Sequence, residues 1–431
     1  MITEMDANRF ATKSLNDPRI LRIVSAALSA VDPYRAVLNH IPEIEGNAYA
    51  LAIGKAAIPM MTALVESIPL SGALAISKHA SSPDFDLFPL LLGGHPIPDA
   101  RSVYAGERAI EFVSSLKEED TLVCLISGGG SALVTAPLIP LEELQALTAS
   151  LLACGANINE INTIRRHLDR VKGGGLARAT KARIVSLILS DVIGNPLEAI
   201  ASGPTARDPT TREDALAILK KYDVEKQVPN SIYNTLLRAP SPALGITKVA
   251  AGDGGESVKV KNSIIGDNKL AAQAALEQAR KEGFSAEILT NEMQGEASQV
   301  GKKLSQQLRD DIAKRSRPFC LIAGGETTVT IHGNGKGGRN QELALSAVDE
   351  LRGLENVMLI SLATDGEDGP TDAAGAVATG ESARRAESLG LSAADYLSRN
   401  DAYTFFESLG DLIKTGPSGT NVNDLVVLVA I

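Results

Sequence analysis

Residues 121–133 read TLVCLISGGGSAL, an uninterrupted apolar run that leads directly into three consecutive glycines. Such a run is typical of a strand that is covered on both faces, as the strands of a parallel sheet are. Four other apolar runs alternate with amphipathic stretches along the first half of the chain: residues 48–53, 73–77, 87–92 and 183–189. Strand, turn and helix in alternation predict an α/β fold with a Rossmann-like parallel sheet flanked by helices.

The length of the chain and a proline-containing segment near its middle predict two domains. A chain of 431 residues is too long for one ordinary core. Residues 239–245 (APSPALG) place two prolines among small residues, which is typical of a linker. We therefore expect a Rossmann-like domain over residues 1–240 and a second α/β domain, with a mixed sheet, over residues 241–431. Strands of the second half, at about residues 257–265 and 327–331, alternate more than those of the first.

Composition and charge narrow the class of protein. Hydrophobic residues make up 44% of the chain and charged residues 22%, as in ordinary globular proteins. The net charge of −10, without any Lys/Arg run, argues against a nucleic-acid partner, and no apolar run reaches the roughly 18 residues of a membrane span. Cys124, Cys154 and Cys320 lack CxxC spacing, so we expect a cytoplasmic protein without a disulfide framework or zinc site. The oligomeric state stays open, with a homodimer as one arrangement.

The glycine-rich turn after residues 121–126 is the first candidate binding segment, because open α/β sheets bind ligands at the carboxyl ends of their strands. It consists of Ser127, Gly128, Gly129, Gly130 and Ser131. Glycines let the backbone approach an anion closely, and the N–H groups and dipole of a following helix favour phosphate. A tight turn that only needs positive φ is the alternative.

Charged residues at other strand ends could complete a phosphate site. Lys55 follows the first strand and would point a cation toward a ligand, unless it is a surface lysine that caps a turn. Asp191 could hold Mg²⁺ or accept a hydroxyl proton, although an Asx turn or helix cap is common at such positions. Glu326 and Asp365 could share the metal, while a solvated acidic turn is the competing interpretation of residues 364–372.

Residues 162–175 form a basic segment in an acidic protein, and they end in three glycines. Such a cluster could clamp phosphate or carboxylate oxygens, and we expect Arg166 or Lys172 to pair with a substrate carboxylate. The alternative is a solvated helix face.

Residues 333–338 (GNGKGG) match the G-x-G-x-x-G pattern of dinucleotide-binding loops, which would favour a nicotinamide-dependent enzyme. The preceding residues 327–331 alternate, however, whereas a Rossmann first strand is continuously apolar. The loop also carries Lys336, and Asp365 lies rather far along for the acidic residue of that motif. We interpret the loop as a flexible, cationic segment, with Arg339 able to bridge two oxygens of a transferring phosphoryl group.

Six segments together resemble the glycerate 2-kinase family, in the same order and over nearly the whole chain. They are residues 93–99 (GGHPIPD), 127–133 (SGGGSAL), 165–176, 189–205 (LSDVIGNPLEAIASGPT), 323–343 (AGGETTVTIHGNGKGGRNQEL) and 363–376. The carboxyl-terminal part of this family is called the MOFRL domain, and many members have been labelled hydroxypyruvate reductase. The resemblance implies two α/β domains with the active site in the cleft between them.

The resemblance also implies a reaction, namely transfer of the γ-phosphoryl group of Mg-ATP to the 2-hydroxyl of D-glycerate, which gives 2-phospho-D-glycerate. Lys55 and Arg339 match the family's functionally important lysine and arginine. From the chemistry we further expect the glycine-rich turn to cradle the ATP phosphates and Asn340 to contact the substrate. An NAD(P)H-dependent hydroxypyruvate reductase is the alternative, and a non-catalytic nucleotide or sugar-acid sensor is a third interpretation.

Overall fold

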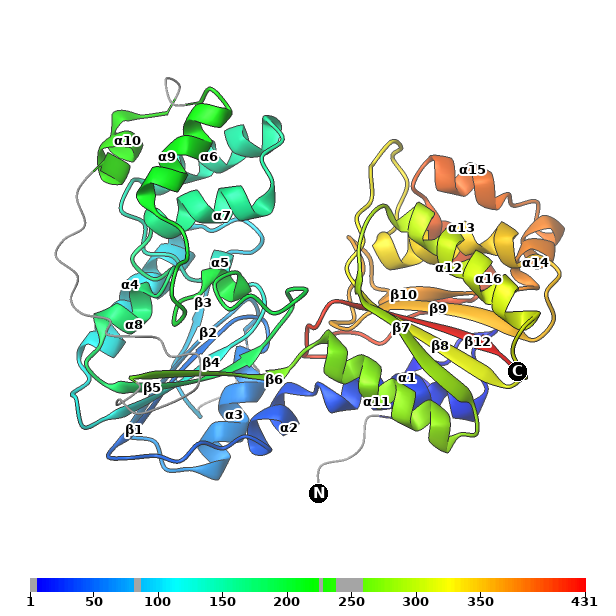
Figure 1. Cartoon of the computed structure of the whole chain (residues 1–431), viewed down its shortest axis with the longest axis horizontal. Helices are drawn as coiled ribbons and strands as arrows, with labels where there is room; N and C mark the ends of the chain where they lie inside the picture. The colour runs from blue at the N-terminus through cyan, green and yellow to red at the C-terminus, as the bar shows by residue number, and fades with distance from the viewer. Residues whose placement is uncertain (1–5, 81–86, 225–227, 238–258) are drawn as a thin grey trace. The chain divides into compact units, whose positions relative to one another are not determined.

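The structure is a computed structural model (Figure 1), and it describes residues 6–80, 87–224, 228–237 and 259–431. The chain divides into two compact units. We call Pro33–Ile265 the parallel-sheet unit, and Met1–Asp32 together with Gly266–Ile431 the mixed-sheet unit. The predicted linker at residues 239–245, and with it the predicted boundary after residue 240, lies outside the described residues.

Two segments belong to a different unit from the one that the sequence suggested. Helix α1 (Pro18–Ala30) packs against α11 (Asn268–Lys281), so the start of the chain is part of the mixed-sheet unit. The strand expected near residues 257–265 is β6 (Val260–Gly266), and it lies beside β5 (Arg183–Leu189) in the first sheet. The sequence of an amphipathic helix or strand does not specify which of the two units it packs against. Only the contacts in the folded chain show this.

The parallel-sheet unit is built on six strands in the order β3-β2-β1-β4-β5-β6. The pairings from β3 to β5 are all parallel, as the uninterrupted apolar runs predict. The strands not yet given are β1 (Ala48–Ile53), β2 (Gly72–Ser77), β3 (Leu90–Leu92) and β4 (Thr121–Ile126).

Helices cover this sheet and form a separate cluster beyond it. One face packs against α4 and α8 through small and branched side chains such as Ala105, Ala109 and Leu176. Four helices, α6, α7, α9 and α10, build an apolar cluster of their own, which the sequence did not predict. The helices of the unit are α2 (Pro33–Leu38), α3 (Ala57–Ser67), α4 (Ala100–Ser114), α5 (Gly130–Leu133), α6 (Leu141–Ala153), α7 (Ile158–His167), α8 (Gly175–Ala179), the 3₁₀ turn η2 (Ile200–Ser202), α9 (Arg212–Lys221) and α10 (Asn230–Leu237).

The mixed-sheet unit has six strands in the order β11-β10-β9-β12-β8-β7. Strand β12 is antiparallel to both of its neighbours, whereas β7 and β8 are parallel, so the predicted mixed sheet is confirmed. The strand expected at residues 327–331 is wrong, because Thr328 makes only an isolated bridge with Glu296. The strands are β7 (Ser285–Met293), β8 (Phe319–Gly325), β9 (Val357–Ala363), β10 (Gly375–Thr379), β11 (Leu412–Ile413) and β12 (Asp424–Ala430).

Both faces of the mixed sheet are covered, α1 and α11 lying on one side and α12 and α13 on the other (Figure 1). Burial on both faces explains why β8, β9 and β12 are buried along their whole length. The remaining helices of the unit are η1 (Ala7–Phe10), α12 (Ala297–Ile312), α13 (Arg339–Leu351), α14 (Ser382–Ser388), α15 (Ala393–Ser398) and α16 (Ala402–Leu409).

Two further properties of the described residues concern the buried cysteines and the apolar helices. Cys124 and Cys320 are buried, and burial raises the pKa of each thiol to about 12, so neither is a nucleophile near neutral pH. Among the described residues, no helix is both long and apolar enough to cross a membrane.

Close packing of α12 on α13 predicts that Gly301→Ala destabilises the protein. A Cβ there would lie 2.1 Å from Ser346 Oγ and 2.2 Å from the Leu343 carbonyl oxygen. The contact with backbone puts the overpacking cost near the upper end of its usual range, at about 3 kcal/mol, and the helix-propensity gain of Ala offsets about 1 kcal/mol of it, so we expect a net loss of about 2 kcal/mol in the free energy of unfolding. Urea denaturation measures it, with the exposed neighbour Lys302→Ala as control. Equal stability of the two variants would contradict the packing.

Candidate active site

The carboxyl ends of β1 and β4 bring Lys55 onto the glycine-rich turn. The two parallel strands are paired in register to their last residues, so the turns that follow start side by side. The Lys55 N–H donates to the Gly128 carbonyl (2.9 Å), and the Ala56 N–H donates to Ser127 Oγ (3.0 Å). The backbone of Lys55 is therefore fixed to the turn that was predicted to bind phosphate.

Packing accounts for part of the glycine content of this turn. Gly129 has a φ of 82°, and a Cβ there would lie 3.2 Å from both Lys55 Cγ and His95 Cδ2. A Cβ on Gly130 would lie 2.8 Å from Ala201 Cβ. The following helix, α5, has only four residues, so the predicted helix dipole contributes little. The groups that this turn can offer to an anion are therefore its backbone N–H groups and the neighbouring Lys55.

Three glycine segments that are distant in sequence meet at this edge of the sheet. Ser131 Oγ lies 2.7 Å from Ser202 Oγ, and the Gly173 N–H donates to the Ser202 carbonyl (2.9 Å). Ala201 and Ser202 have φ values of 50° and 60°, which are uncommon for residues other than glycine. Backbone strain of this kind is concentrated at functional sites.

Arg166 and Lys172, the predicted substrate-binding cations, are buried and already paired. Lys172 Nζ lies 2.7 Å from Asp169 Oδ2 and donates to the Val134 carbonyl (3.1 Å). Burial alone would raise the pKa of Asp169, but the Lys172 ammonium outweighs it and holds that pKa below its usual range. Arg166 Nε lies 3.0 Å from Asp208 Oδ1. In this arrangement both cations are engaged in the interior, so neither is presented to a ligand.

Asp191 lies two residues beyond the end of β5, whose last residues pair with the end of β4. Its side chain is half-buried, and the parallel pairing puts Asp191 at the same edge of the sheet as the glycine-rich turn. The sequence prediction that these two turns lie at one edge therefore agrees with the topology.

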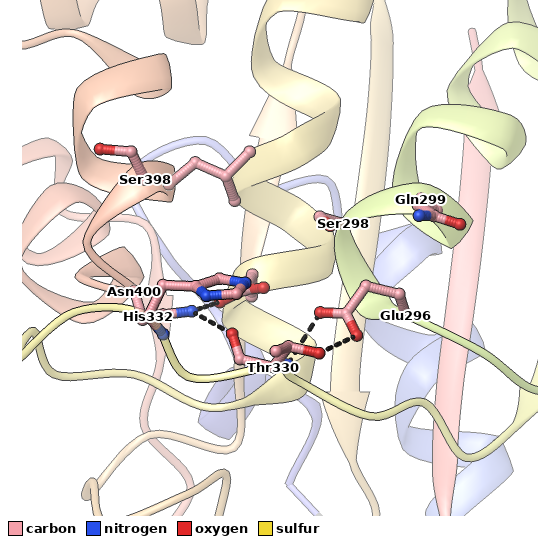
Figure 2. Close-up of a pocket in the computed structure, with 9 residues that line it drawn as sticks. Glu296, Ser298, Gln299, Thr330, His332, Ser398 and Asn400 are labelled. Carbon is pink, nitrogen blue, oxygen red and sulfur yellow. Dashed lines mark hydrogen bonds between the residues drawn. The ribbon is translucent and has the colours of Figure 1, made fainter.

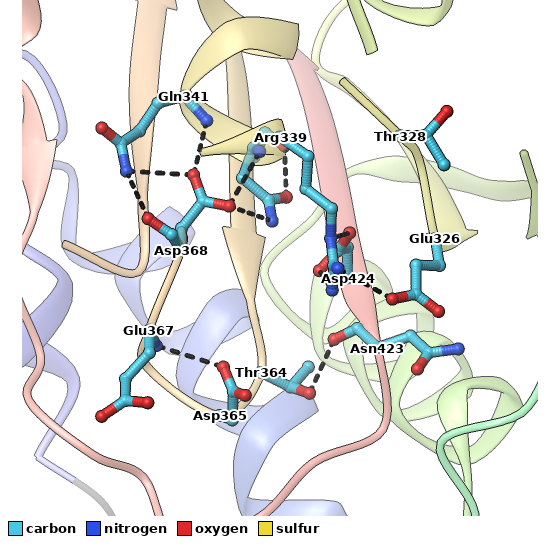
Figure 3. A network of polar contacts seen from close by, with 12 residues as sticks. Glu326, Thr328, Arg339, Gln341, Thr364, Asp365, Glu367, Asp368, Asn423 and Asp424 are labelled. Carbon is cyan, nitrogen blue, oxygen red and sulfur yellow. Dashed lines mark hydrogen bonds and ion pairs between the residues drawn. The ribbon is translucent and has the colours of Figure 1, made fainter. Parts of the chain in front are cut away.

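In the mixed-sheet unit, Arg339 lies against two carboxylates (Figure 3). Its Nε and Nη2 donate to the two oxygens of Asp424 (2.6 and 3.0 Å), and its Nη1 lies 2.7 Å from Glu326 Oε1. Asp424 is fully buried, whereas Glu326 is exposed. Burial favours the neutral guanidine, but the carboxylates of Asp424 and Glu326 outweigh it and raise the pKa of Arg339. The arginine is thus oriented from the buried side and open on the Glu326 side.

Asp424 was not among the site residues predicted from the sequence. It is the first residue of β12 and pairs with the last residues of both β8 and β9, which explains why Arg339, Glu326 and the turn after β9 converge there. The available signal was an acidic residue immediately before a long apolar strand, in the segment NVNDLVVLV.

A buried network fixes the start of α13. Asp368 accepts the backbone N–H groups of Asn340 (3.1 Å) and Gln341 (2.9 Å), and Asn340 Oδ1 accepts from Ser361 Oγ (2.7 Å). Burial raises the pKa of Asp368 to about 6. Asn340, predicted to contact substrate, is instead buried within this network, next to Arg339 in the chain.

The predicted metal ligands of this unit, Glu326 and Asp365, follow β8 and β9. Asp365 is half-buried and its Oδ1 accepts the Glu367 N–H (3.1 Å). Within the described part of the chain, no three His, Cys, Asp or Glu side chains gather as a metal cluster. Mg²⁺ needs only one or two carboxylates when substrate phosphates supply further oxygens, so the residues present are compatible with that ion.

The glycine loop at residues 333–338 is anchored, which differs from the flexible loop that was predicted. Asn400 Oδ1 accepts the N–H groups of His332 (2.7 Å) and Gly333 (3.0 Å), as Figure 2 shows for His332. A Cβ on Gly333 would lie 2.3 Å from the Arg399 carbonyl oxygen. At least Gly333 therefore serves close packing against the chain itself.

A cavity of about 350 Å³ borders this anchor (Figure 2). Asn400 Nδ2 donates to Glu342 Oε2 (2.9 Å), which ties the loop to α13 one turn beyond Arg339. Burial raises the pKa of Glu342. The anchored loop and the buried network together hold Arg339 in place from both sides.

Comparison with known proteins identifies the family. The family described as "Domain of unknown function (DUF4147)" matches residues 19–237, and the "MOFRL family" matches residues 319–424. A curated protein named Glycerate 2-kinase, from Pyrococcus horikoshii, is 40% identical over 95% of this chain and 96% of its own length. The chain belongs to the glycerate kinase family. The crystal structure of a glycerate kinase from Thermotoga maritima superposes with a TM-score of 0.85, at 38% identity over 95% of this chain and 98% of that one.

One relative of this glycerate kinase family member has a different name. A protein from Agrobacterium vitis, 36% identical over 94% of this chain and 92% of its own length, is provisionally named a hydroxypyruvate reductase. The loop at residues 333–338 lacks the structural context of a dinucleotide fingerprint, because β8 ends at Gly325 and no strand leads directly into it. The G-x-G-x-x-G match, on which the alternative of a nicotinamide-dependent enzyme rested, therefore no longer supports that alternative.

The buried Lys172–Asp169 pair predicts a large stability loss for Lys172→Met. The substitution keeps most of the side-chain volume but leaves Asp169 buried without its cation, which should cost about 3–5 kcal/mol of unfolding free energy. Urea denaturation at neutral pH measures the loss. The exposed Arg170→Met, in the same segment, is the control, and a Lys172→Met variant as stable as that control would contradict a structural role.

Proposed function

We propose that this chain is a glycerate 2-kinase, which transfers the γ-phosphoryl group of ATP to the 2-hydroxyl of D-glycerate and gives 2-phospho-D-glycerate. The observation that carries the proposal is 40% identity, over 95% of the chain, to a protein named Glycerate 2-kinase. The structure supports it with two anchored cations at polar strand ends, one in each unit. Phosphoryl transfer depends on such positioned charges more than on covalent chemistry.

In the parallel-sheet unit, Lys55 and the glycine-rich turn bind nucleotide phosphates in this proposal. The bond from the Lys55 N–H to Gly128 fixes the base of the side chain beside the turn. Backbone N–H groups of Gly129 and Gly130 supply further donors, since the absence of side chains lets phosphate oxygens approach.

In the mixed-sheet unit, Arg339 stabilises the transferring phosphoryl group. Asp424 holds two of its nitrogens from the buried side, which leaves Nη1 on exposed Glu326. A phosphoryl oxygen can take the place of Glu326 without disturbing Asp424. Asp424 is thus a positioning residue, and Arg339 is the residue that contacts the substrate.

Carboxylates complete the proposed machinery. When bound, Mg²⁺ neutralises phosphate charge; the candidate ligands are Asp191 in the parallel-sheet unit, and Glu326 or Asp365 in the mixed-sheet unit. Asp191 is also suited to accept the proton of the glycerate 2-hydroxyl, because a half-buried carboxylate at a strand end is a competent general base when it reaches the hydroxyl.

Removal of either cation should abolish most turnover. We expect Lys55→Ala and Arg339→Ala each to lower kcat on the order of 10²–10³-fold, as loss of one preorganised charge donor does. ADP release with D-glycerate and Mg-ATP measures this, and phosphorus NMR identifies the phosphorylated oxygen.

Two exposed cations provide matched controls for these variants. Lys117→Ala and Arg352→Ala, the latter just beyond the end of α13, should keep wild-type turnover. Near-normal activity of the Lys55 or Arg339 variant would refute its assigned role. NADH oxidation with hydroxypyruvate, without ADP release from glycerate, would instead establish the reductase.

The positioning role of Asp424 predicts a kcat effect without a matching change in KM. Asp424→Asn keeps the shape of the side chain but removes the charge that pairs with Arg339, so we expect kcat to fall roughly 10- to 100-fold, the worth of one charged hydrogen bond. A variant whose KM for ATP or glycerate rises while kcat stays constant would argue against positioning.

A further inference from the structure

The structure changes which residue of the basic segment can receive an anion. Arg165 lies in the last turn of α7, and its Nη2 donates to the Ser131 carbonyl (3.4 Å) on the glycine-rich turn. The same turn binds the backbone of Lys55 at Gly128. Arg165 therefore contacts the last residue of the predicted phosphate-binding turn, whereas Lys55 contacts the turn near its start. Arg165 was not among the predicted substrate-binding residues.

The other Lys and Arg side chains of this segment are engaged or exposed. Arg166 pairs with Asp208 and Lys172 with Asp169, both in the interior, as described above. Arg170 is exposed, and its Nη2 lies 4.0 Å from a carboxylate oxygen of Glu107.

Arg165 differs from its neighbours because it is half-buried without a carboxylate partner. Within the described part of the chain, no carboxylate lies at ion-pair distance from its guanidinium, which donates to the neutral carbonyl of Ser131. Burial lowers the pKa of Arg165, and Asp169 offsets this only in part. A partly buried charge without a counter-charge is costly, and a bound oxyanion would recover that cost.

The helix that carries Arg165 is capped at its start and packed along one face. A capping box between Asn157 and Glu160 starts α7, and Ile161 and Ile164 pack in the helical cluster with α6, α9 and α10. The guanidinium is therefore presented to the turn by a helix whose own face is fixed by an apolar core.

We propose that Arg165 binds an oxyanion of a substrate at the glycine-rich turn, with the planar guanidinium donating hydrogen bonds to two anionic oxygens. The source is either the carboxylate of the hydroxy acid or a nucleotide phosphate, which share this chemistry. The inference rests on the proposed function, because that function supplies both oxyanions. It assigns to Arg165 the role that the sequence suggested for Arg166 or Lys172.

Steady-state kinetics of Arg165→Gln and Arg165→Lys test the proposal. We expect the KM of one substrate to rise roughly 10- to 100-fold in Arg165→Gln and less in Arg165→Lys, which keeps the charge but loses the fork. A rise for D-glycerate identifies the carboxylate as the ligand, and a rise for ATP identifies a phosphate. The matched control is Arg170→Gln, which should have wild-type KM values.

Stability and binding measurements separate this role from a structural one. The thermal unfolding midpoint of Arg165→Gln should equal or exceed that of the wild type, because a partly buried unpaired charge is removed. The shift of that midpoint on adding D-glycerate, or on adding ATP, should shrink for the substrate whose KM rises. Unchanged KM values and shifts, or a lowered midpoint with a fall in kcat alone, would overturn the proposal.

The outcomes also distinguish failure of the inference from failure of the proposed function. A wild-type enzyme that turns over D-glycerate, beside an Arg165→Gln variant with wild-type KM values, refutes the role of Arg165 alone. A wild-type protein that neither releases ADP with D-glycerate nor is stabilised by D-glycerate or ATP refutes the proposed function, and the role of Arg165 falls with it.

Discussion

The bidentate ion pair between Arg339 and Asp424 is the contact around which the polar edge of the mixed sheet is organised. Asp424 is completely buried at the start of β12, and a buried carboxylate requires a partner that also satisfies its hydrogen bonds. Arg339 provides two donors from the first residue of α13. The end of β8, the end of β9 and the start of α13 therefore meet at one charge pair, and Asp368 holds the helix in the same place.

The parallel-sheet unit reaches a similar result by a different means. Its polar edge is organised by backbone contacts between glycine-rich segments, in which the Gly128 carbonyl and Ser202 carbonyl accept N–H groups from distant parts of the chain. Close approach of this kind tolerates no side chain at Gly130, where a Cβ would meet Ala201. One unit thus uses a buried charge to fix a cation, and the other uses the backbone.

Burial and pairing, more than residue type, separate the cations available for a ligand from those that stabilise the fold. Lys172 and Arg166 are themselves buried and each pairs with a carboxylate, so both belong to the interior. Arg339 is intermediate, because Asp424 holds it while its third nitrogen faces an exposed glutamate. Arg165 is half-buried beside a neutral carbonyl. The basic residues of a sequence motif do not by themselves show which cations are available to a ligand and which stabilise the fold.

The sequence by itself determined the buried strands of the first sheet, the turns that follow them and the family. The predicted runs 48–53, 121–126 and 183–189 coincide with β1, β4 and β5, because a strand covered on both faces must be apolar throughout and leaves a local signature. The positions of Lys55 after the first strand and of Arg339 after a glycine-rich segment are likewise local features.

The tertiary structure alone decided which sheet β6 joins, that Asp424 holds Arg339, and which arginine of the basic segment borders the turn. Arg165 and Arg166 are adjacent in sequence, but successive side chains on a helix point about 100° apart. One of them therefore meets Asp208 in the interior and the other meets Ser131 at the edge of the sheet. These partners lie far away in the sequence, and only the folded chain brings them into contact.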